Sequence, residues 1–256
     1  MSMACDADGV YASCVRLARA LDSSEASVVL IRHGESLANV SNVVCSLMHN
    51  GIKPEYSLSP KGKQQAHESG VVFAKTLPAA HHVLIYTSPF SRATATAEIF
   101  GRACAESASA SGAVEQPHVV EWLRERCFGE DAELKPSNEP YERYWRHDAV
   151  DPFTPPPEGG VGRESVGEVA LRTASGFTEL LDRIGATTIG TNVVLVAHGD
   201  TLSTLAAVLA FCQREESERT IQAFTDALRV HRSHGLKQAE YVTFPRLGVS
   251  HETALT

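Results

Sequence analysis

Three short apolar runs, each followed by a turn, constrain the fold of this chain most strongly. They comprise residues Val28–Ile31, Val83–Tyr86 and Val193–Ala197. Each run is too short and too uniformly apolar for an amphipathic helix, and its β-branched residues are typical of a strand buried on both faces. We therefore predict an α/β fold with three layers (α/β/α), in which a mostly parallel sheet carries helices on both faces.

Cationic side chains follow these runs. The first run leads into Arg32 and His33, the last leads into His198, and Arg92 lies shortly after the second. Ligands of open α/β sheets bind beyond the carboxyl ends of the strands. We therefore expect the four side chains to meet at one edge of the sheet and to form a binding site there.

The residue types at this edge indicate a phosphoryl group. Two histidines could bind a metal ion with Asp200 as a third ligand, but the guanidinium beside His33 disfavours a cation. Two arginines and two histidines instead match the oxygens of a tetrahedral anion. A neutral imidazole is a competent nucleophile toward phosphorus, and the departing alkoxide then needs a proton from a nearby carboxylic acid. The spacing leaves open which histidine attacks and which acid donates.

The composition is that of an ordinary globular protein, with 43% hydrophobic and 21% charged residues among 256. The net charge of −8 argues against nucleic-acid binding. We expect no membrane span, since no apolar stretch is long enough, and no signal peptide in residues 1–27. The scattered cysteines predict reduced thiols and a cytoplasmic protein. We expect one domain over residues 1–256, whose oligomeric state stays open, with a homodimer as one alternative.

Capping signals and apolar periodicity predict the helices. A Ser-Pro pair beginning at Ser59 is typical of a helix start, and the pair beginning at Ser88 repeats it. Asp200 is expected to cap a helix that begins near Thr201. Residues 126–163 are expected to form an irregular insert, either a lid over the site or a flexible loop. The helices predicted after the first run cover residues 59–77, 89–104, 165–184 and 201–212.

Four segments, in order along the chain, resemble the motifs of the histidine phosphatase superfamily in its phosphoglycerate-mutase-like branch (branch 1). The Arg-His-Gly signature lies in Leu30–Ser36, with Asn39 just beyond it. The other three motifs are Thr87–Ala93, Leu123–Gly129 and Val196–Gly199. Together the four are far more specific than an Arg-His-Gly triplet alone.

The resemblance implies a reaction without a metal or an organic cofactor, in which a small phosphorylated substrate transfers its phosphoryl group to a histidine. His33 would be that nucleophile, and Glu125 would donate a proton to the leaving group. Water would then attack the phosphohistidine, with Glu125 as the base. Arg32, Arg92 and His198 would hold the phosphoryl oxygens, and Ser36, Asn39 and Gly199 would complete the substrate site.

Departures from the mutase pattern favour a phosphatase. The loop after Asn39 lacks the usual Gly-Trp-x-Asp turn, Asp200 stands where asparagine is usual, and the acidic run Glu130–Glu133 would repel a bisphosphate. The first alternative is a 2,3-bisphosphoglycerate-dependent phosphoglycerate mutase, which the chain length and the Trp-containing insert favour. The second is a non-catalytic scaffold that binds a phosphorylated protein, against which the complete set of motif residues argues.

Overall fold

The computed structural model of the protein describes residues 6–108, 112–158, 160–185 and 190–245. At its centre is a sheet of six strands: β1 Ser27–Arg32, β2 His82–Thr87, β3 Ala113–Val114, β4 His118–Val119, β5 Thr191–Ala197 and β6 Tyr241–Phe244. The order is β3-β2-β5-β1-β6, and β4 also pairs with β2. All pairs are parallel except β1 with β6. The predicted α/β class and mostly parallel sheet are confirmed.

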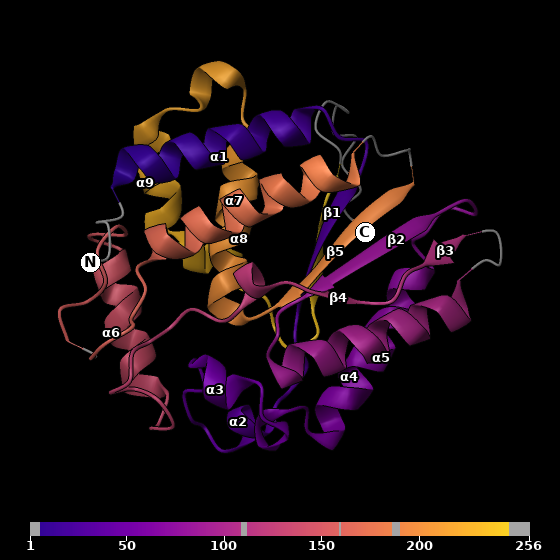
Figure 1. Ribbon diagram of the computed structural model, residues 1–256, viewed down its shortest axis with the longest axis horizontal. Coiled ribbons are helices and arrows are strands. Elements are labelled where there is room, and N and C mark those ends of the chain that lie inside the picture. The colour runs from indigo at the N-terminus through magenta and orange to yellow at the C-terminus, as the bar shows by residue number, and fades with distance from the viewer. Residues whose placement is uncertain (1–5, 109–111, 159, 186–189, 246–256) are drawn as a thin grey trace.

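Helices cover both faces of the sheet because both faces of its central strands are apolar (Figure 1). Val28 and Leu30 of β1 pack toward α1, α7 and α8, whereas Val29 and Ile31 pack toward α4 and α5. Within the described ranges, no helix is both long and apolar enough to cross a bilayer. The covering helices are α1 Ala7–Asp22, α4 Pro60–Ala74, α5 Ser91–Ser107, α7 Val166–Ile184, α8 Gly199–Cys212 and α9 Ile221–Arg229.

Two of the predicted helix starts are confirmed and two are wrong. Ser59 caps α4, and Ser165 caps α7 in a capping box with Glu168. By contrast, Phe90 rather than Ser88 precedes α5, and it makes no side-chain cap. His198 precedes α8, so Asp200 lies inside the first turn instead of capping the helix. Ser88 and Asp200 are not free to cap because their side chains bond to groups of the site described below.

The insert expected to be irregular contains a helix, α6 Asn138–Asp148. Tyr141, Tyr144 and Trp145 follow the i, i+3, i+4 spacing of one helical face, which is the signal that could have predicted it. Residues 134–137 bond to residues 42–44, so the insert lies beside α2 and α3, as Figure 1 shows. The short helices are α2 Leu37–Val40, α3 Met48–Gly51 and the 3-10 turns Pro54–Tyr56, Glu121–Leu123, Glu216–Glu218 and His231–His234.

Every cysteine in the described part of the chain is buried and outside any disulfide bond, as expected for reduced side chains. These are Cys14, Cys45, Cys104, Cys127 and Cys212. Cys5 lies outside the described residues.

Candidate active site

All of the predicted site residues except His198, which lies directly beside His33, line one cavity of about 240 Å³. His33 and His198 directly follow the parallel neighbours β1 and β5, and their ring centroids are 5.2 Å apart. Arg92 reaches the same place from the first turn of α5. The cavity is lined by Arg32, His33, Ser36, Ala38, Asn39, Val43, Cys45, Arg92, Glu125, Phe128, Tyr141, Trp145, Gly199, Asp200 and Arg232.

His33 is held so that one ring nitrogen faces the cavity. Its Nδ1 lies 2.7 Å from the carbonyl oxygen of Gly34, and because a carbonyl only accepts, Nδ1 carries the proton. Nε2 therefore presents its lone pair and accepts a hydrogen bond of 3.1 Å from Nε of Arg92. Burial and then the Arg92 charge hold the pKa of His33 well below the ordinary value of 6.5. The ring is thus neutral and nucleophilic near neutral pH.

Both arginines keep a buried nitrogen without a partner among the described residues. Arg32 donates from Nη1 to the carbonyl oxygen of Leu236 at 2.8 Å, and Arg92 donates from Nη2 to that of Cys45 at 3.0 Å. Nε of Arg32 and Nη1 of Arg92 have no hydrogen bond. Buried donors are normally paired, so both nitrogens are able to donate to the oxygens of an anionic ligand.

His198 repeats this pattern. Its Nε2 lies 2.8 Å from Oγ of Ser88, while its buried Nδ1 has no hydrogen-bond partner in the described chain. Burial, followed by the charge of Arg92, holds its pKa well below 6.5. Arg32 and Arg92 line the cavity, and the His198 ring adjoins that of His33. Three buried nitrogens without a hydrogen-bond partner among the described residues thus belong to side chains in or beside the site.

Glu125 supplies the carboxyl group that the chemistry requires. Its Oε2 lies 4.0 Å from Nδ1 of His198, and its Oε1 accepts bonds from the Arg126 amide at 2.9 Å and the Thr201 hydroxyl at 3.3 Å. Burial raises the pKa of Glu125 above the ordinary value of 4.5, and the nearby Asp200 charge raises it further. The carboxyl group therefore keeps its proton to a higher pH than an exposed glutamate does.

Ser36 and Asn39 lie at the cavity but bond to each other. They form a capping box at the start of α2, in which the Ser36 hydroxyl donates to Oδ1 of Asn39 at 2.9 Å. The Asn39 amide group keeps its donor side for a ligand. Gly199 packs against Arg32, and a Cβ there would lie 3.2 Å from the guanidinium carbon. A larger residue would thus press on the arginine.

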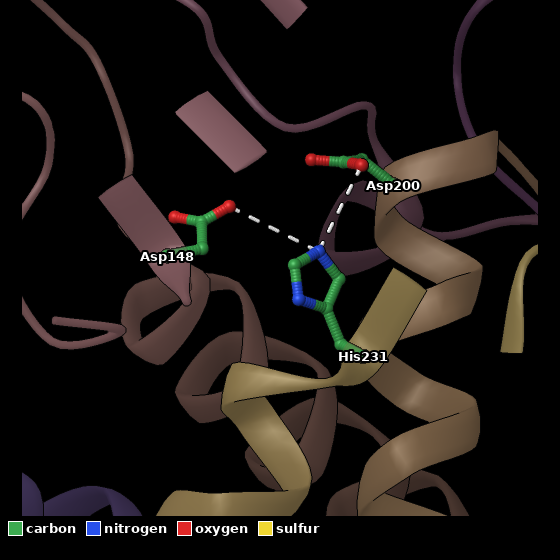
Figure 2. A group of neighbouring side chains, drawn as sticks. All are labelled: Asp148, Asp200 and His231. Carbon is green, nitrogen blue, oxygen red and sulfur yellow. Dashed lines mark ion pairs between the residues drawn. The ribbon is translucent and has the colours of Figure 1, made fainter. Parts of the chain in front are cut away.

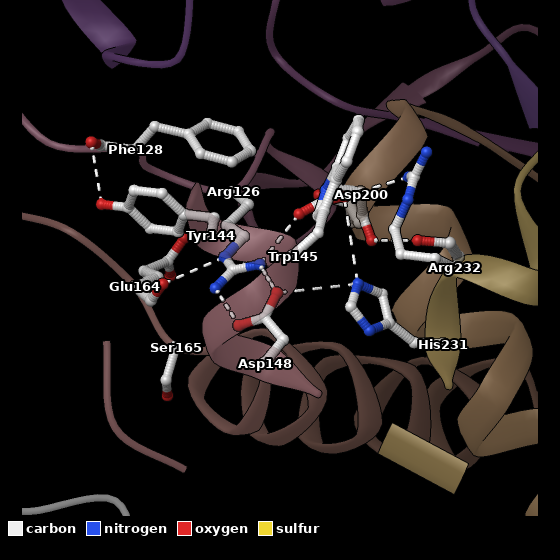
Figure 3. A network of polar contacts seen from close by, with 12 residues as sticks. Arg126, Phe128, Tyr144, Trp145, Asp148, Glu164, Ser165, Asp200, His231 and Arg232 are labelled. Carbon is white, nitrogen blue, oxygen red and sulfur yellow. Dashed lines mark hydrogen bonds and ion pairs between the residues drawn. The ribbon is translucent and has the colours of Figure 1, made fainter. Parts of the chain in front are cut away.

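The sequence did not reveal the network behind the cavity wall (Figure 3). Asp200 accepts bonds from Nη1 of Arg126 at 3.0 Å and from Nε1 of Trp145 at 3.0 Å. Arg126 is completely buried and also makes a two-nitrogen pair with Asp148, at 2.6 and 2.8 Å. The network thus joins Asp200, which follows β5, to Arg126 in the acid motif and to α6.

Asp148, Asp200 and His231 come close enough together to suggest a metal site (Figure 2). Nε2 of His231 lies 3.9 Å from Asp148 and 4.0 Å from Asp200. However, the guanidinium of Arg126 already lies against both carboxylates. A divalent ion at the same oxygens would have to displace a buried cation, so these residues do not fit a metal.

The acidic run after the acid motif lies outside the cavity, whereas the sequence-based argument placed it against the ligand. None of Glu130–Glu133 lines the cavity. Glu133 instead accepts bonds from the amides of Ser46 and Leu47 and from the side chain of Asn50. Its charge stabilises the loop that leads into α3, so this departure from the mutase pattern carries no weight.

Comparison with known proteins assigns the family. A sequence model of the histidine phosphatase superfamily, branch 1, matches residues 28–243. The chain belongs to this superfamily. The match spans all four motifs and the strands that present them, and it confirms the resemblance seen in the sequence.

Relatives of this histidine phosphatase include named phosphatases. A glucosyl-3-phosphoglycerate phosphatase of Mycolicibacterium vanbaalenii is 29% identical over 183 residues, which cover 71% of this chain and 73% of the relative. The solved structure of a mycobacterial hydrolase is 26% identical, covers 85% of this chain and 88% of its own, and has a TM-score of 0.59. A phosphoserine phosphatase of Entamoeba histolytica, solved with phosphoserine, shares the fold at 19% identity, 86% and 90% coverage and a TM-score of 0.58. The prediction of a phosphomonoesterase is confirmed.

Proposed function

We propose that this histidine phosphatase hydrolyses a small phosphorylated organic acid by way of a phosphohistidine. The observation that carries the proposal is a set of three buried nitrogens without a partner among the described residues, on side chains in or beside the cavity of His33: Arg32, Arg92 and His198. They match the three non-bridging oxygens of a phosphoryl group. The relatives named for phosphoglycerate and phosphoserine esters support an acidic leaving group.

In the first step, the Nε2 lone pair of His33 attacks phosphorus and the bond to the ester oxygen breaks. In the free enzyme Nε of Arg92 donates to Nε2 of His33, and a phosphoryl oxygen accepts this hydrogen bond when the substrate binds. Glu125 gives its proton to the departing oxygen, so the leaving group departs as an alcohol. The arginines stabilise the charge that develops on the phosphoryl oxygens.

In the second step, water attacks the phosphohistidine. Glu125, now ionised, takes a proton from that water, phosphate departs, and the electron pair of the N–P bond returns to Nε2. Both enzyme groups recover their starting states. Every role falls on a residue of this chain, so neither step needs a metal ion.

The proposal is tested by phosphate release from a panel of esters, with and without a chelator. We expect release from phosphorylated acids, no effect of EDTA, and loss of turnover in His33→Ala. 3-Phosphoglycerate with 2,3-bisphosphoglycerate as a primer tests the mutase alternative in the same series. Formation of 2-phosphoglycerate without phosphate release, full activity in His33→Ala, or strong inhibition by EDTA would each contradict the proposal.

A further inference from the structure

We propose that Arg232 binds the carboxylate of the substrate's leaving group and so determines specificity. This inference rests on the proposed function, because it concerns the same cavity. Arg232 lies in the 3-10 turn His231–His234, far along the chain from the four motifs, and it still lines the cavity. It is the third guanidinium there, and the two-step chemistry does not use it.

The protein holds Arg232 firmly at this position. Its Nη1 donates to Oδ1 of Asp200 at 3.2 Å, and its guanidinium carbon lies 4.0 Å from the ring centroid of Trp145. Tyr141 stacks on Trp145 with centroids 5.5 Å apart. Figure 3 shows Arg232, Trp145 and Asp200 close together. An arginine fixed in this way loses little further conformational freedom when a ligand binds.

Its remaining donors are available to a ligand. Among the described residues the guanidinium of Arg232 makes no hydrogen bond other than that to Asp200, and 37% of the side chain is exposed. Asp200 does not offset its charge alone, since Asp200 also pairs with Arg126. The free edge of a guanidinium carries paired N–H groups, whose geometry matches a carboxylate.

The place of Arg232 relative to Arg32 limits the length of the substrate. Arg32 packs on Gly199 and Arg232 bonds to Asp200, the next residue. Arg32 also donates to the carbonyl oxygen of Leu236, in the segment that carries Arg232. Two guanidiniums that contact neighbouring residues at the start of α8 suit a ligand whose phosphate and carboxylate are a few bonds apart, as in a phosphorylated three-carbon acid.

The test compares two esters that differ only at the proposed contact. 3-Phosphoglycerate carries a carboxylate where glycerol 3-phosphate carries a hydroxymethyl group. We expect wild type to prefer 3-phosphoglycerate, and Arg232→Gln to lower its kcat/KM about 10- to 100-fold, the range for losing a charged hydrogen bond. The kcat/KM for glycerol 3-phosphate should stay within about twofold. Arg229→Gln removes an arginine outside the cavity and should change neither value.

A purely structural role for Arg232 would give a different result. If Arg232 only supports Trp145, Arg232→Gln and Arg232→Lys would slow both esters equally, which would overturn the inference. Equal kcat/KM for the two esters in wild type would also overturn it. Phosphate release from neither ester, nor from p-nitrophenyl phosphate, would instead contradict the proposed function.

Discussion

Single residues in the site have protonation states set by burial. Burial beside the arginines holds the pKa of both histidines well below 6.5, whereas burial in the same surroundings raises the pKa of Glu125 above 4.5. A neutral nucleophile and a protonated acid are the pair that the first step requires. The arginines therefore favour neutral histidines and, in the proposed mechanism, also bind the phosphoryl oxygens.

The raised pKa of Glu125 predicts the pH dependence of catalysis. His33 stays neutral down to a pH well below 6.5, and Glu125 stays protonated to a pH above 4.5. The rate of hydrolysis of alkyl phosphates should therefore be highest on the acidic side. It should fall as the pH rises through the raised pKa of Glu125, because the acid is then lost. The pH profile of kcat/KM for an alkyl ester measures this fall.

Glu125→Gln should remove that acid while keeping the shape of the side chain. We expect a loss of about 10²–10⁴-fold for an alkyl phosphate, the usual contribution of general acid catalysis. The loss in the phosphorylation step should be much smaller for p-nitrophenyl phosphate, whose leaving group departs without a proton. Single-turnover measurements of the release of each leaving group compare the two rate losses. Equal losses would show that Glu125 is not the acid.

At the scale of elements, the sheet and its sequence-local features could be predicted, and contacts between distant segments could not. The central strands follow from continuous apolar runs. The start of α4 follows from Ser59, because this residue caps the helix by a bond to an amide only three residues away. Asp200 is expected to cap a helix because its sequence neighbours suggest nothing else. Its actual partners, Arg126, Trp145 and Arg232, lie far away in the sequence. Arg232 lies in none of the four motifs, so its place at the site could be seen only in the folded structure.

The helix α6 is attached to the site by a buried charge network. Asp148, at its last turn, is fully buried against Arg126, and Tyr144 donates to the carbonyl oxygen of Phe128 at 2.8 Å. These contacts make α6 a fixed wall of the cavity. The idea of a flexible loop over the site does not fit them.

Removing Asp148 tests the strength of that attachment. Asp148→Ala leaves Arg126 buried with one partner fewer, which should lower the free energy of unfolding by about 3–5 kcal/mol. The control is Asp226→Ala, since Asp226 pairs with Arg229 on the exposed face of α9 and should contribute less than about 1 kcal/mol. Urea unfolding measures both variants. Equal changes would show that the buried network does not hold α6.

The whole molecule combines a net negative surface with a cationic cavity. The chain has a net charge of −8, while Arg32, Arg92 and Arg232 face the cavity together with only two carboxyl groups. The sheet edge concentrates these groups because β1, β2 and β5 run parallel and end together. A local site for an anion thus coexists with a protein body that repels polyanions such as nucleic acids.

The central claim is that His33 carries the phosphoryl group during turnover. Rapid mixing with a radiolabelled phosphate ester, quenching in alkaline denaturant and peptide mapping tests it directly, since phosphohistidine survives alkali. We predict label on the peptide that contains His33, formed before phosphate appears, with no label and no turnover in His33→Ala. His147→Ala, altered on α6 at a residue that does not line the cavity, should label like wild type. Turnover at the full rate without label on His33 would contradict the account.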